Sequence, residues 1–366
     1  MRICYIGDAD NIHMRKWVIW FAKKGHDVHL ITDRPAEITG VKIYAIGNKK
    51  RNSFFNFIKK ILQTRKLVKK IEPDVLHAHY AFGYGTFGAF ANYHPFVLSP
   101  WGSDILIEPE KSKMVKFLVK FALKKADLIT CDGDNTVEKM IRFGTDPKKI
   151  HRIYHGVDPE QFSPTKRDKK LKERLGVSDS PLIISTRNLD LIYGVETLIK
   201  SVPLVLKKIP NAKFIVAGKL VYDKTVEKDY LKKLAKSLGV INSIRFVGSI
   251  PHDELPYYLA SSDAYVSTSL SDGGIALSTL EAMACEVAPV VTDVANNRKW
   301  IKDGENGFVI PLKDPKALAE KIIYLIENEE IRKNFGKNSR KIVEEEQNYD
   351  KEMAKAERLC MDLIKQ

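Results

Sequence analysis

A glycine-containing loop between a predicted strand and a predicted helix is the first place in the sequence where chemistry is expected. Asp272, Gly273 and Gly274 follow the strand predicted over residues 264–267 and precede a helix predicted to begin near Ser278. Open α/β sheets bind ligands beyond the carboxyl ends of their strands, and a helix N-terminus favours anions. Two glycines let a ligand approach the backbone closely. The loop therefore predicts an anion-binding site.

The same residues have a second interpretation that needs no ligand. Ser278 and Glu281 have the spacing of a capping box, in which a serine and a glutamate satisfy the free N–H groups at a helix start. Taken alone, this pair favours the cap over a binding role.

The sequence from residue 267 to 311 carries a pattern that is longer than either motif. In order along the chain it reads SDGG, LEAMAC, PVVTD, ANNRKWI and DGENGFVIP. This order closely resembles the donor-site region of family 4 glycosyltransferases. The resemblance implies the GT-B fold, in which two Rossmann-like α/β domains face each other across a cleft and the last helix crosses back to the first domain. It also implies transfer of a sugar from a nucleoside-diphosphate sugar.

Length, charge and cysteine content limit the class of protein. The 366 residues are enough for two domains, and a hydrophobic content of 44% is typical of a globular chain. The net charge of +14 points to an anionic partner. The four cysteines form no CxxC motif, which fits a reducing cytosol and indicates neither zinc nor disulfides. No apolar stretch is long enough to span a bilayer, and the opening MRICYIGDAD resembles a strand more than a signal peptide.

Strand and helix patterns alternate along the chain and predict a parallel sheet covered on both faces in each of two domains. The N-terminal domain is expected over residues 1–164, with strands at 2–6, 28–32, 41–45, 75–79, 96–99 and 128–131. The C-terminal domain is expected over 165–346, with strands at 182–186, 214–217, 244–247, 264–267, 287–292 and 307–310. Residues 347–366 are expected to form the helix that packs on the N-terminal domain.

Arg187 and Asn188 follow a predicted strand and are candidates for donor binding. An arginine there can fork onto a diphosphate and offset the charge that develops on the leaving group, and the alternative is a surface arginine paired with an acid. In the resembling family a lysine that also touches phosphate follows this arginine. Tyr193 occupies that position here, so the site has one cation fewer. Gly248 and Ile250, after the strand IRFVG, are expected near the base.

The resemblance assigns Glu281 to the second glutamate of the family's two-acid motif, which accepts hydrogen bonds from the donor ribose. The first glutamate is expected eight positions earlier, where Gly273 stands, and the nearest acid is Asp272. We expect a one-residue insertion that brings Asp272 to that place; otherwise the sugar-contacting carboxylate is absent. The donor contacts are then expected to include Ser278 and the backbone N–H groups of Gly273, Gly274, Ile275 and Ala276.

The first predicted strand is followed by a turn that holds Gly7, Asp8, Asn11 and His13. The resembling family places a Gly-rich loop here, close to the donor. We therefore expect Gly7 to contact the donor, and Asp8, Asn11 and His13 to contact the acceptor.

Two pairs of aspartates look like the metal-binding acids of the other glycosyltransferase fold. They are Asp8-x-Asp10 and Asp132-x-Asp134. Short Asp pairs are common at turns and helix N-caps, and no cluster of His or Glu supports them here. We therefore expect neither a metal ion nor a cofactor.

Two more strand ends in the N-terminal domain carry acceptor candidates. His79 lies in LHAHY, where a local hydrogen bond explains it as well as an acceptor contact does. In SPWGSDIL, Trp101 stands where many family members have a histidine near the reacting carbon, and Asp104 remains. We expect Trp101 to stack on a sugar and Asp104 to orient an acceptor hydroxyl. Loss of the histidine also fits an inactive enzyme.

Residues 49–70 and 111–125 are rich in lysine and contain aromatic residues. The first segment has nine basic residues and no acid. Basic amphipathic helices fit anionic lipid head groups, whereas the alternative for each helix alone is a packed helix with a solvated lysine face. Two such helices in one domain favour contact with a membrane.

The sequence therefore predicts a retaining, metal-independent glycosyltransferase whose catalytic residues are Asp104, Arg187 and Glu281. The expected acceptor is a hydroxyl of a glycan or lipid-linked saccharide of the cell envelope, at the cytoplasmic face of the membrane. The sequence contains no recognisable nucleic-acid-binding module. The alternatives are a nucleotide-sugar epimerase and a catalytically silent nucleotide-sugar-binding protein, whereas the absence of a pyridoxal-phosphate lysine motif disfavours a phosphorylase.

Overall fold

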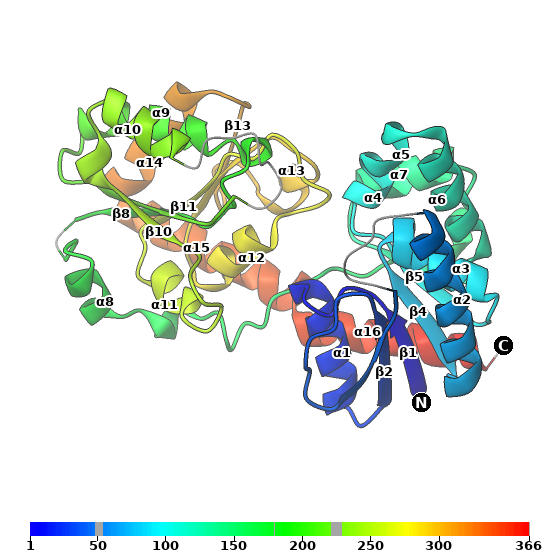
Figure 1. The fold of residues 1–366 in the computed structure, drawn as a ribbon. Helices are drawn as coiled ribbons and strands as arrows, with labels where there is room; N and C mark the ends of the chain where they lie inside the picture. Colours follow the sequence, from blue (N-terminus) through cyan, green and yellow to red (C-terminus); the bar gives the residue numbers. More distant parts are fainter. Residues whose placement is uncertain (48–53, 179, 221–228, 366) are drawn as a thin grey trace. The chain divides into compact units, whose positions relative to one another are not determined.

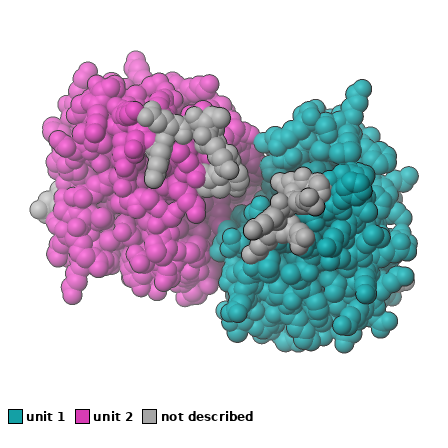
Figure 2. Space-filling model, viewed as in Figure 1, with its two compact units in different colours: residues 1–155, 350–366 teal, residues 156–349 magenta. Residues whose placement is uncertain are grey.

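The computed structural model describes residues 1–47, 54–178, 180–220 and 229–365, and the chain divides into two units (Figures 1 and 2). Unit 1 contains Met1–His155 and Asp350–Gln366, and unit 2 contains Gly156–Tyr349. The sequence-based boundaries were placed after residues 164 and 346. The divisions in the structure lie after residues 155 and 349.

Unit 1 is built on a parallel sheet whose described strands have the order β3-β2-β1-β4-β5-β6-β7. The apolar runs of the central strands are buried, as expected for parallel strands that are covered on both faces. In the register of the sheet, Ile3 lies between Val28 and Val75. The strands are β1 (Arg2–Ile6), β2 (Asp27–Thr32), β3 (Val41–Ala45), β4 (Val75–His79), β5 (Phe96–Ser99), β6 (Leu128–Cys131) and β7 (Ile150–Arg152).

Helices connect these strands and pack on the sheet (Figure 1). The described helices are α1 (Ile12–Lys23), α2 (Phe54–Ile71), α3 (Thr86–Ala91), α4 (Ser103–Leu106), α5 (Glu108–Lys111), α6 (Lys113–Lys125), α7 (Asp134–Arg142) and α16 (Tyr349–Ile364). The last helix is joined to unit 1 by polar contacts. Trp20 Nε1 donates to Asp350 Oδ1 at 2.7 Å, and His26 Nε2 lies 2.5 Å from Glu357 Oε1.

Unit 2 contains a second parallel sheet, whose described strands have the order β10-β9-β8-β11-β12-β13. They are β8 (Leu182–Ser185), β9 (Lys213–Ala217), β10 (Ile244–Gly248), β11 (Ala264–Ser267), β12 (Pro289–Thr292) and β13 (Phe308–Ile310). The described helices are α8 (Lys169–Arg174), α9 (Val195–Leu206), α10 (Tyr230–Ser237), α11 (Leu255–Ala260), α12 (Leu277–Ala284), α13 (Asn297–Trp300), α14 (Pro315–Glu327) and α15 (Glu329–Glu346).

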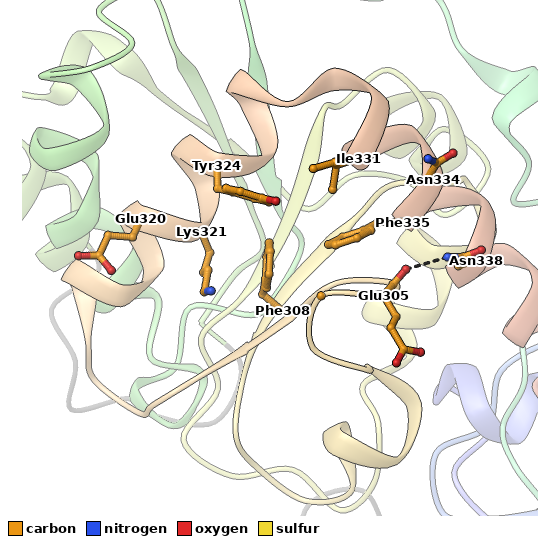
Figure 3. A pocket seen from close by; sticks show the side chains of 10 residues that line it. Glu305, Phe308, Glu320, Lys321, Tyr324, Ile331, Asn334, Phe335 and Asn338 are labelled. Atoms are coloured by element: carbon orange, nitrogen blue, oxygen red, sulfur yellow. Dashed lines mark hydrogen bonds between the residues drawn. The ribbon is translucent and has the colours of Figure 1, made fainter.

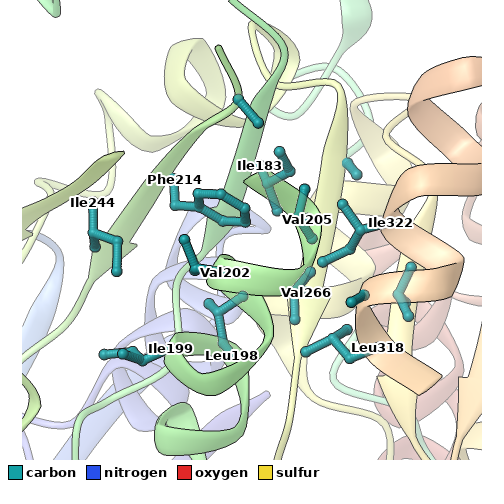
Figure 4. Packing of buried hydrophobic residues seen from close by; sticks show 14 of the residues in the cluster. Ile183, Leu198, Ile199, Val202, Val205, Phe214, Ile244, Val266, Leu318 and Ile322 are labelled. Carbon is teal, nitrogen blue, oxygen red and sulfur yellow. The ribbon is translucent and has the colours of Figure 1, made fainter. Parts of the chain in front are cut away.

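One of the two buried hydrophobic clusters of unit 2 lies between this sheet and helices α9 and α14. Figure 4 shows Leu198 and Val202 of α9 and Ile322 of α14 packed against strand residues such as Ile183 and Val266. These side chains are buried, and their packing fixes the strands whose carboxyl ends carry the candidate site.

The prediction of an α/β chain with two parallel sheets is confirmed, and the short strand β7 is an element that the sequence analysis missed. Each sheet has one place where the chain leaves two neighbouring strands toward opposite edges of the sheet. This point lies between β1 and β4 in unit 1 and between β8 and β11 in unit 2. Ligands in open α/β sheets bind outside the carboxyl ends of the strands at such a switch point.

Candidate functional site

The switch point of unit 2 brings Arg187 and Asp272 together. Arg187 follows β8 and Asp272 follows β11, the neighbouring strand. Arg187 Nη2 donates to Asp272 Oδ1 at 2.6 Å, and the two side chains are only 10% and 14% exposed. This geometry places a partly desolvated guanidinium where the fold predicts a ligand.

Two further side chains contact the Arg187 guanidinium. Its central carbon lies 4.5 Å from the centre of the Tyr193 ring, in a cation–π contact. Its Nη1 lies 3.4 Å from Ser278 Oγ, which also accepts a hydrogen bond from Tyr265 at 2.8 Å. Burial acts to lower the pKa of Arg187, but Asp272, Tyr265 and Tyr193 together outweigh it, so the pKa is raised and the side chain stays charged. Arg187 is therefore a preformed cationic group.

The loop after β11 supplies backbone donors to the same place. Helix α12 begins at Leu277 with Ala276 as its N-cap, and no side chain caps it. The capping box predicted for Ser278 and Glu281 is therefore wrong, because the helix begins earlier and Ser278 lies inside its first turn. Among the described residues, the N–H groups of Gly273, Gly274, Ile275 and Ala276 have no hydrogen-bond acceptor. Free N–H groups at a helix N-terminus can bind an anion.

Close packing of strand ends holds the backbone beside Arg187. Gly218 donates its N–H to the Gly248 carbonyl at 2.8 Å. A Cβ at Gly218 would lie 2.3 Å from the Arg187 carbonyl oxygen and 3.1 Å from the Cα of Asn188, so only glycine fits there. Ile250, two residues after Gly248, packs against the second hydrophobic cluster of unit 2. Gly248 and Ile250, which were predicted to bind the sugar donor, thus lie close to the strand end that carries Arg187.

Glu281 is buried on α12 and faces a histidine that the sequence analysis missed. His252 Nε2 lies 3.4 Å from Glu281 Oε1, and Gln161 Nε2 donates to His252 Nδ1 at 3.2 Å. Because Nδ1 accepts this bond, the neutral ring carries its proton on Nε2, toward the carboxylate. His252 lies two residues after Ile250, in a stretch already expected near the base, and this position was the available signal.

In unit 1, the turn after β1 is held by bonds within the turn and to the neighbouring strand. Asp8 Oδ1 accepts from the N–H of Asp10 at 3.0 Å, and Asp8 Oδ2 lies 3.1 Å from Arg34 Nη1. Asn11 caps α1 by accepting from the N–H of His13 at 2.8 Å. These contacts occupy Asp8 and Asn11 in structural bonds. A Cβ at Gly7 would lie 2.3 Å from Met14 Sδ, so glycine lets α1 approach β1.

His13, His79 and Trp101 come together at the switch point of unit 1. Trp101 Nε1 donates to His79 Nδ1 at 3.2 Å, and the His13 ring lies 5.7 Å from the Trp101 ring. His155, which was not predicted, lies 4.4 Å from His13 between ring centres. The ring centres of His77 and His79 are 4.5 Å apart. The result is a cluster of imidazoles packed against the indoles of Trp101 and Trp17.

The two histidines of β4 are neutral and contain atoms without a partner. Burial lowers the pKa of His77 to about 3. Burial, together with the nearby His77, His155 and His13, lowers the pKa of His79 well below its usual value. Because His79 Nδ1 accepts from Trp101, its proton lies on Nε2, a buried atom that has no hydrogen-bond partner among the described residues. A neutral N–H donor of this kind can bind a polar ligand atom.

Asp104 is fully buried on α4 and has its oxygens occupied. Oδ1 accepts from the N–H of Trp101 at 2.9 Å, and Oδ2 accepts from the N–H of Ala81. Burial raises its pKa to about 6, although these N–H groups act in the opposite direction. The geometry therefore gives Asp104 a role in holding the loops after β4 and β5, and leaves no free oxygen for an acceptor hydroxyl.

A cavity of about 760 Å³ lies elsewhere in unit 2, between α14, α15 and the turn before β13 (Figure 3). Phe308, Tyr324 and Phe335 line it, and Asn338 Nδ2 donates to the Glu305 carbonyl at 2.8 Å on its rim. It adjoins the edge strand β13 and not the switch point. We therefore assign the candidate site to the switch points.

Metal-binding clusters and membrane-spanning helices are both absent from the described residues. No three His, Cys, Asp or Glu side chains in the described ranges are grouped so that they could hold a metal ion. No described helix is long and apolar enough to cross a membrane.

Two family profiles match the chain and together account for both units. The profile of the family described as Glycosyl transferase 4-like matches residues 2–133, and that of Glycosyl transferases group 1 matches residues 166–342. The second match contains the switch point of unit 2, including Arg187, Asp272 and Glu281.

Relatives and solved structures resemble the chain over most of its length. N-acetyl-alpha-D-glucosaminyl L-malate synthase from Bacillus anthracis is 23% identical, with 94% of this chain and 91% of the relative covered. Sulfoquinovosyl transferase SQD2 from Arabidopsis thaliana is 28% identical over 77% of this chain and 55% of the relative. The structure of Anabaena Alr3699/HepE in complex with UDP matches with a TM-score of 0.84 at 17% identity, covering 99% of this chain and 100% of that one.

Proposed function

Because this chain is a family 4-like glycosyltransferase with the GT-B fold, we propose that it moves a sugar from a nucleoside-diphosphate sugar to a hydroxyl group. UDP is the first nucleotide to test, since a structural neighbour has been solved with UDP and with UDP-glucose.

The observation that carries this proposal is the position of Arg187. Its guanidinium lies at the switch point of unit 2, next to the free N–H groups of the loop before α12. Together these groups can hold the two phosphates of the donor. Glu281, with His252 beside it, is then available for the ribose hydroxyls.

The proposed reaction needs only charges that the chain supplies. As the bond between the sugar C1 and the diphosphate oxygen breaks, negative charge grows on the diphosphate, and Arg187 and the loop N–H groups stabilise it. The acceptor hydroxyl attacks C1 from the same face and passes its proton to the leaving diphosphate. This sequence retains the configuration at C1 and needs neither a metal ion nor a cofactor.

We assign the acceptor to the switch point of unit 1. The half-buried indole of Trp101 is available for stacking on a sugar ring, and the free Nε2–H of His79 can donate to an acceptor oxygen. The names of relatives show acceptors as different as malate and a phosphatidylinositol mannoside. We propose a glycan or lipid-linked hydroxyl of the cell envelope as the acceptor of this chain.

The test is a thermal-shift screen of the whole chain with UDP, GDP, ADP and TDP and their sugars, with and without EDTA. A ligand that binds only the folded state raises the melting temperature, and a selective shift that EDTA leaves unchanged is the expected result. Release of free nucleotide from the selected donor, measured with and without hydroxyl acceptors, then separates an enzyme from a silent binder. A shift without any turnover would favour the silent binder, and a shift that EDTA abolishes would contradict metal independence.

A further inference from the structure

We propose that the outer surface of α2, α3 and α6 docks on a bilayer of anionic lipids. We call the exposed side chains of these three helices the basic-aromatic surface. It lies in unit 1 alone, and its docking does not depend on which sugar donor the chain uses. Its first distinguishing feature is a set of large apolar side chains that are exposed.

The outward side of α2 carries apolar side chains where a helix on a sheet normally carries polar ones. Phe55 is 84% exposed and Phe54 is 68% exposed. Ile58 and Leu62 continue this side one and two turns later and are also exposed. The helix uses a different side for packing, since Asn56, Thr64, Val68 and Ile71 are buried. The exposed apolar side chains are therefore not the core face of α2.

Helix α6 repeats this arrangement. Phe117 is 65% exposed and Met114 is exposed beside it, whereas Val119, Ala122 and Leu123 form the buried side. Helix α3 lies between α2 and α6 (Figure 1). Contacts between rings join the three helices. Phe57 of α2 packs on Phe87 of α3, and Phe90 of α3 packs on Phe121 of α6, with ring centres 4.7 Å apart.

Basic side chains surround these apolar residues. Those exposed on α2 are Lys59, Arg65, Lys66, Lys69 and Lys70. Those exposed on α6 are Lys113, Lys120 and Lys124. Within the described part of the chain none of the eight has an ion-pair partner, and neither helix contains an acid.

Exposed apolar side chains surrounded by basic ones favour one partner for the basic-aromatic surface. A protein partner or a second copy would satisfy the apolar residues, but a second copy presents the same excess of positive charge and would be repelled. A bilayer of anionic lipids satisfies both features, since its head groups attract lysine and arginine while its interface accepts phenylalanine, isoleucine and leucine. The solvated-lysine-face interpretation is excluded by the exposed apolar residues on the same side of each helix.

The experiment is sedimentation of the whole chain with vesicles of phosphatidylglycerol and with vesicles of phosphatidylcholine, at low and high salt. We expect binding to the anionic vesicles only, and loss of binding at high salt. Lys59→Glu with Lys66→Glu and Lys120→Glu should lower partitioning about 100-fold, because each lysine near an anionic surface contributes about a fivefold factor. Phe55→Ser with Phe117→Ser should lower it at least about 100-fold, because burial of each phenylalanine ring contributes at least about a tenfold factor.

A matched control uses lysines that are exposed in unit 2. Lys236→Glu with Lys316→Glu and Lys337→Glu changes the net charge by the same amount and should leave binding nearly unchanged. Melting temperature and the nucleotide-induced shift report on folding and the donor site separately, so failure of the docking surface cannot be confused with failure of the proposed function. Equal loss in the control triple variant would mean nonspecific charge attraction and would overturn the proposal. No binding to anionic vesicles, or a dimer that the phenylalanine variants dissociate, would also overturn it.

Discussion

Arg187 and Asp272 form an ion pair at 2.6 Å although 85 residues separate them in the sequence. A diphosphate bound to this guanidinium would accept hydrogen bonds from the same N–H groups that bind Asp272 in the ligand-free chain. The Asp272 carboxylate therefore holds the Arg187 guanidinium in place and also competes with the diphosphate for it. Single substitutions at either residue can test these two effects.

Arg187→Ala should weaken UDP binding about 10- to 100-fold and leave uridine binding nearly unchanged, because hydrogen bonds to charged groups contribute about 1.5–3 kcal/mol. Isothermal titration with the two ligands measures the difference. Arg187→Lys is the matched control, since it keeps the charge and loses the fork. Equal losses for UDP and uridine would refute the assignment of Arg187 to the diphosphate.

Asp272→Asn should act in opposite directions on two readouts. Removal of the buried carboxylate leaves Arg187 without its counter-charge, so the ligand-free protein should melt at a lower temperature. The same change removes the competitor, so affinity for UDP should rise a few-fold. If Asp272 instead contacts the donor sugar, the variant will bind UDP normally and a UDP-sugar more weakly, which comparison of the two ligands will show.

The Tyr193 ring should matter as a flat surface beneath Arg187 and not through its hydroxyl. Tyr193→Phe keeps the ring and should retain UDP affinity. Tyr193→Ala should lose about 5- to 30-fold, since a cation–π contact to a partly desolvated cation contributes about 1–2 kcal/mol. Titration of both variants with UDP tests this, and a larger loss in the phenylalanine variant would show that the hydroxyl is the important group.

Gly218 and Gly248 offer a matched pair of glycine substitutions. Both have positive φ angles, but a Cβ at Gly218 would meet the Arg187 carbonyl at 2.3 Å, whereas a Cβ at Gly248 would meet nothing within 4 Å. Gly218→Ala should therefore lower the free energy of unfolding by about 3 kcal/mol and weaken UDP binding. Gly248→Ala should cost about 1 kcal/mol of stability. Urea unfolding and UDP titration measure these effects, and equal costs would contradict the packing argument.

The buried histidines of unit 1 should make stability depend on pH. Burial lowers the pKa of His13, His77 and His79 in the folded protein, so below the usual histidine value of about 6.5 the unfolded chain binds more protons. Stability should then fall as the pH drops from about 7 toward 5, by up to about 1.4 kcal/mol per pH unit for each histidine. Asp104 opposes this below about pH 6, because its raised pKa makes the folded state bind the extra proton.

Urea unfolding across this pH range measures the slope. His79→Gln should make the slope shallower, because it removes one of the three groups that gain a proton on unfolding. A stability that is constant over this range would show that the imidazoles are accessible to water and protons.

The central strands were predictable because they are short apolar runs with polar ends. The predicted bounds of β1, β3, β4, β5, β6 and β11 match the structure at both ends. Strand β7 was missed because Ile150–Arg152 is short, half-buried and two-thirds basic, as edge strands often are. The other edge strand, β3, was found because its sequence VKIYA is longer and more apolar than the IHR of β7.

The site was predictable in part for a different reason. Arg187 and Glu281 lie in patterns that a sequence displays, whereas the pairing of Arg187 with Asp272 depends on two strands becoming neighbours. Ser278, predicted to contact the donor, does not cap the helix as in the alternative interpretation, because the helix begins one residue before it, and its hydroxyl lies against Arg187 instead. His252 and His155 were missed because each is a lone histidine in a loop, and only the packed structure shows its neighbours.

Unit 1 is formed by two separate segments of the chain, and this affects how it folds during synthesis. Trp20, His26 and Tyr154 all bond to residues of α16, which is synthesised after the whole of unit 2. At about 5–20 residues per second, translation of the intervening unit takes about 10–40 s. During that time the first unit exists as a nascent domain without its closing helix, with the Trp20 indole and its neighbours open to chaperones. Unit 1 is complete only after the residues of α16 have left the exit tunnel.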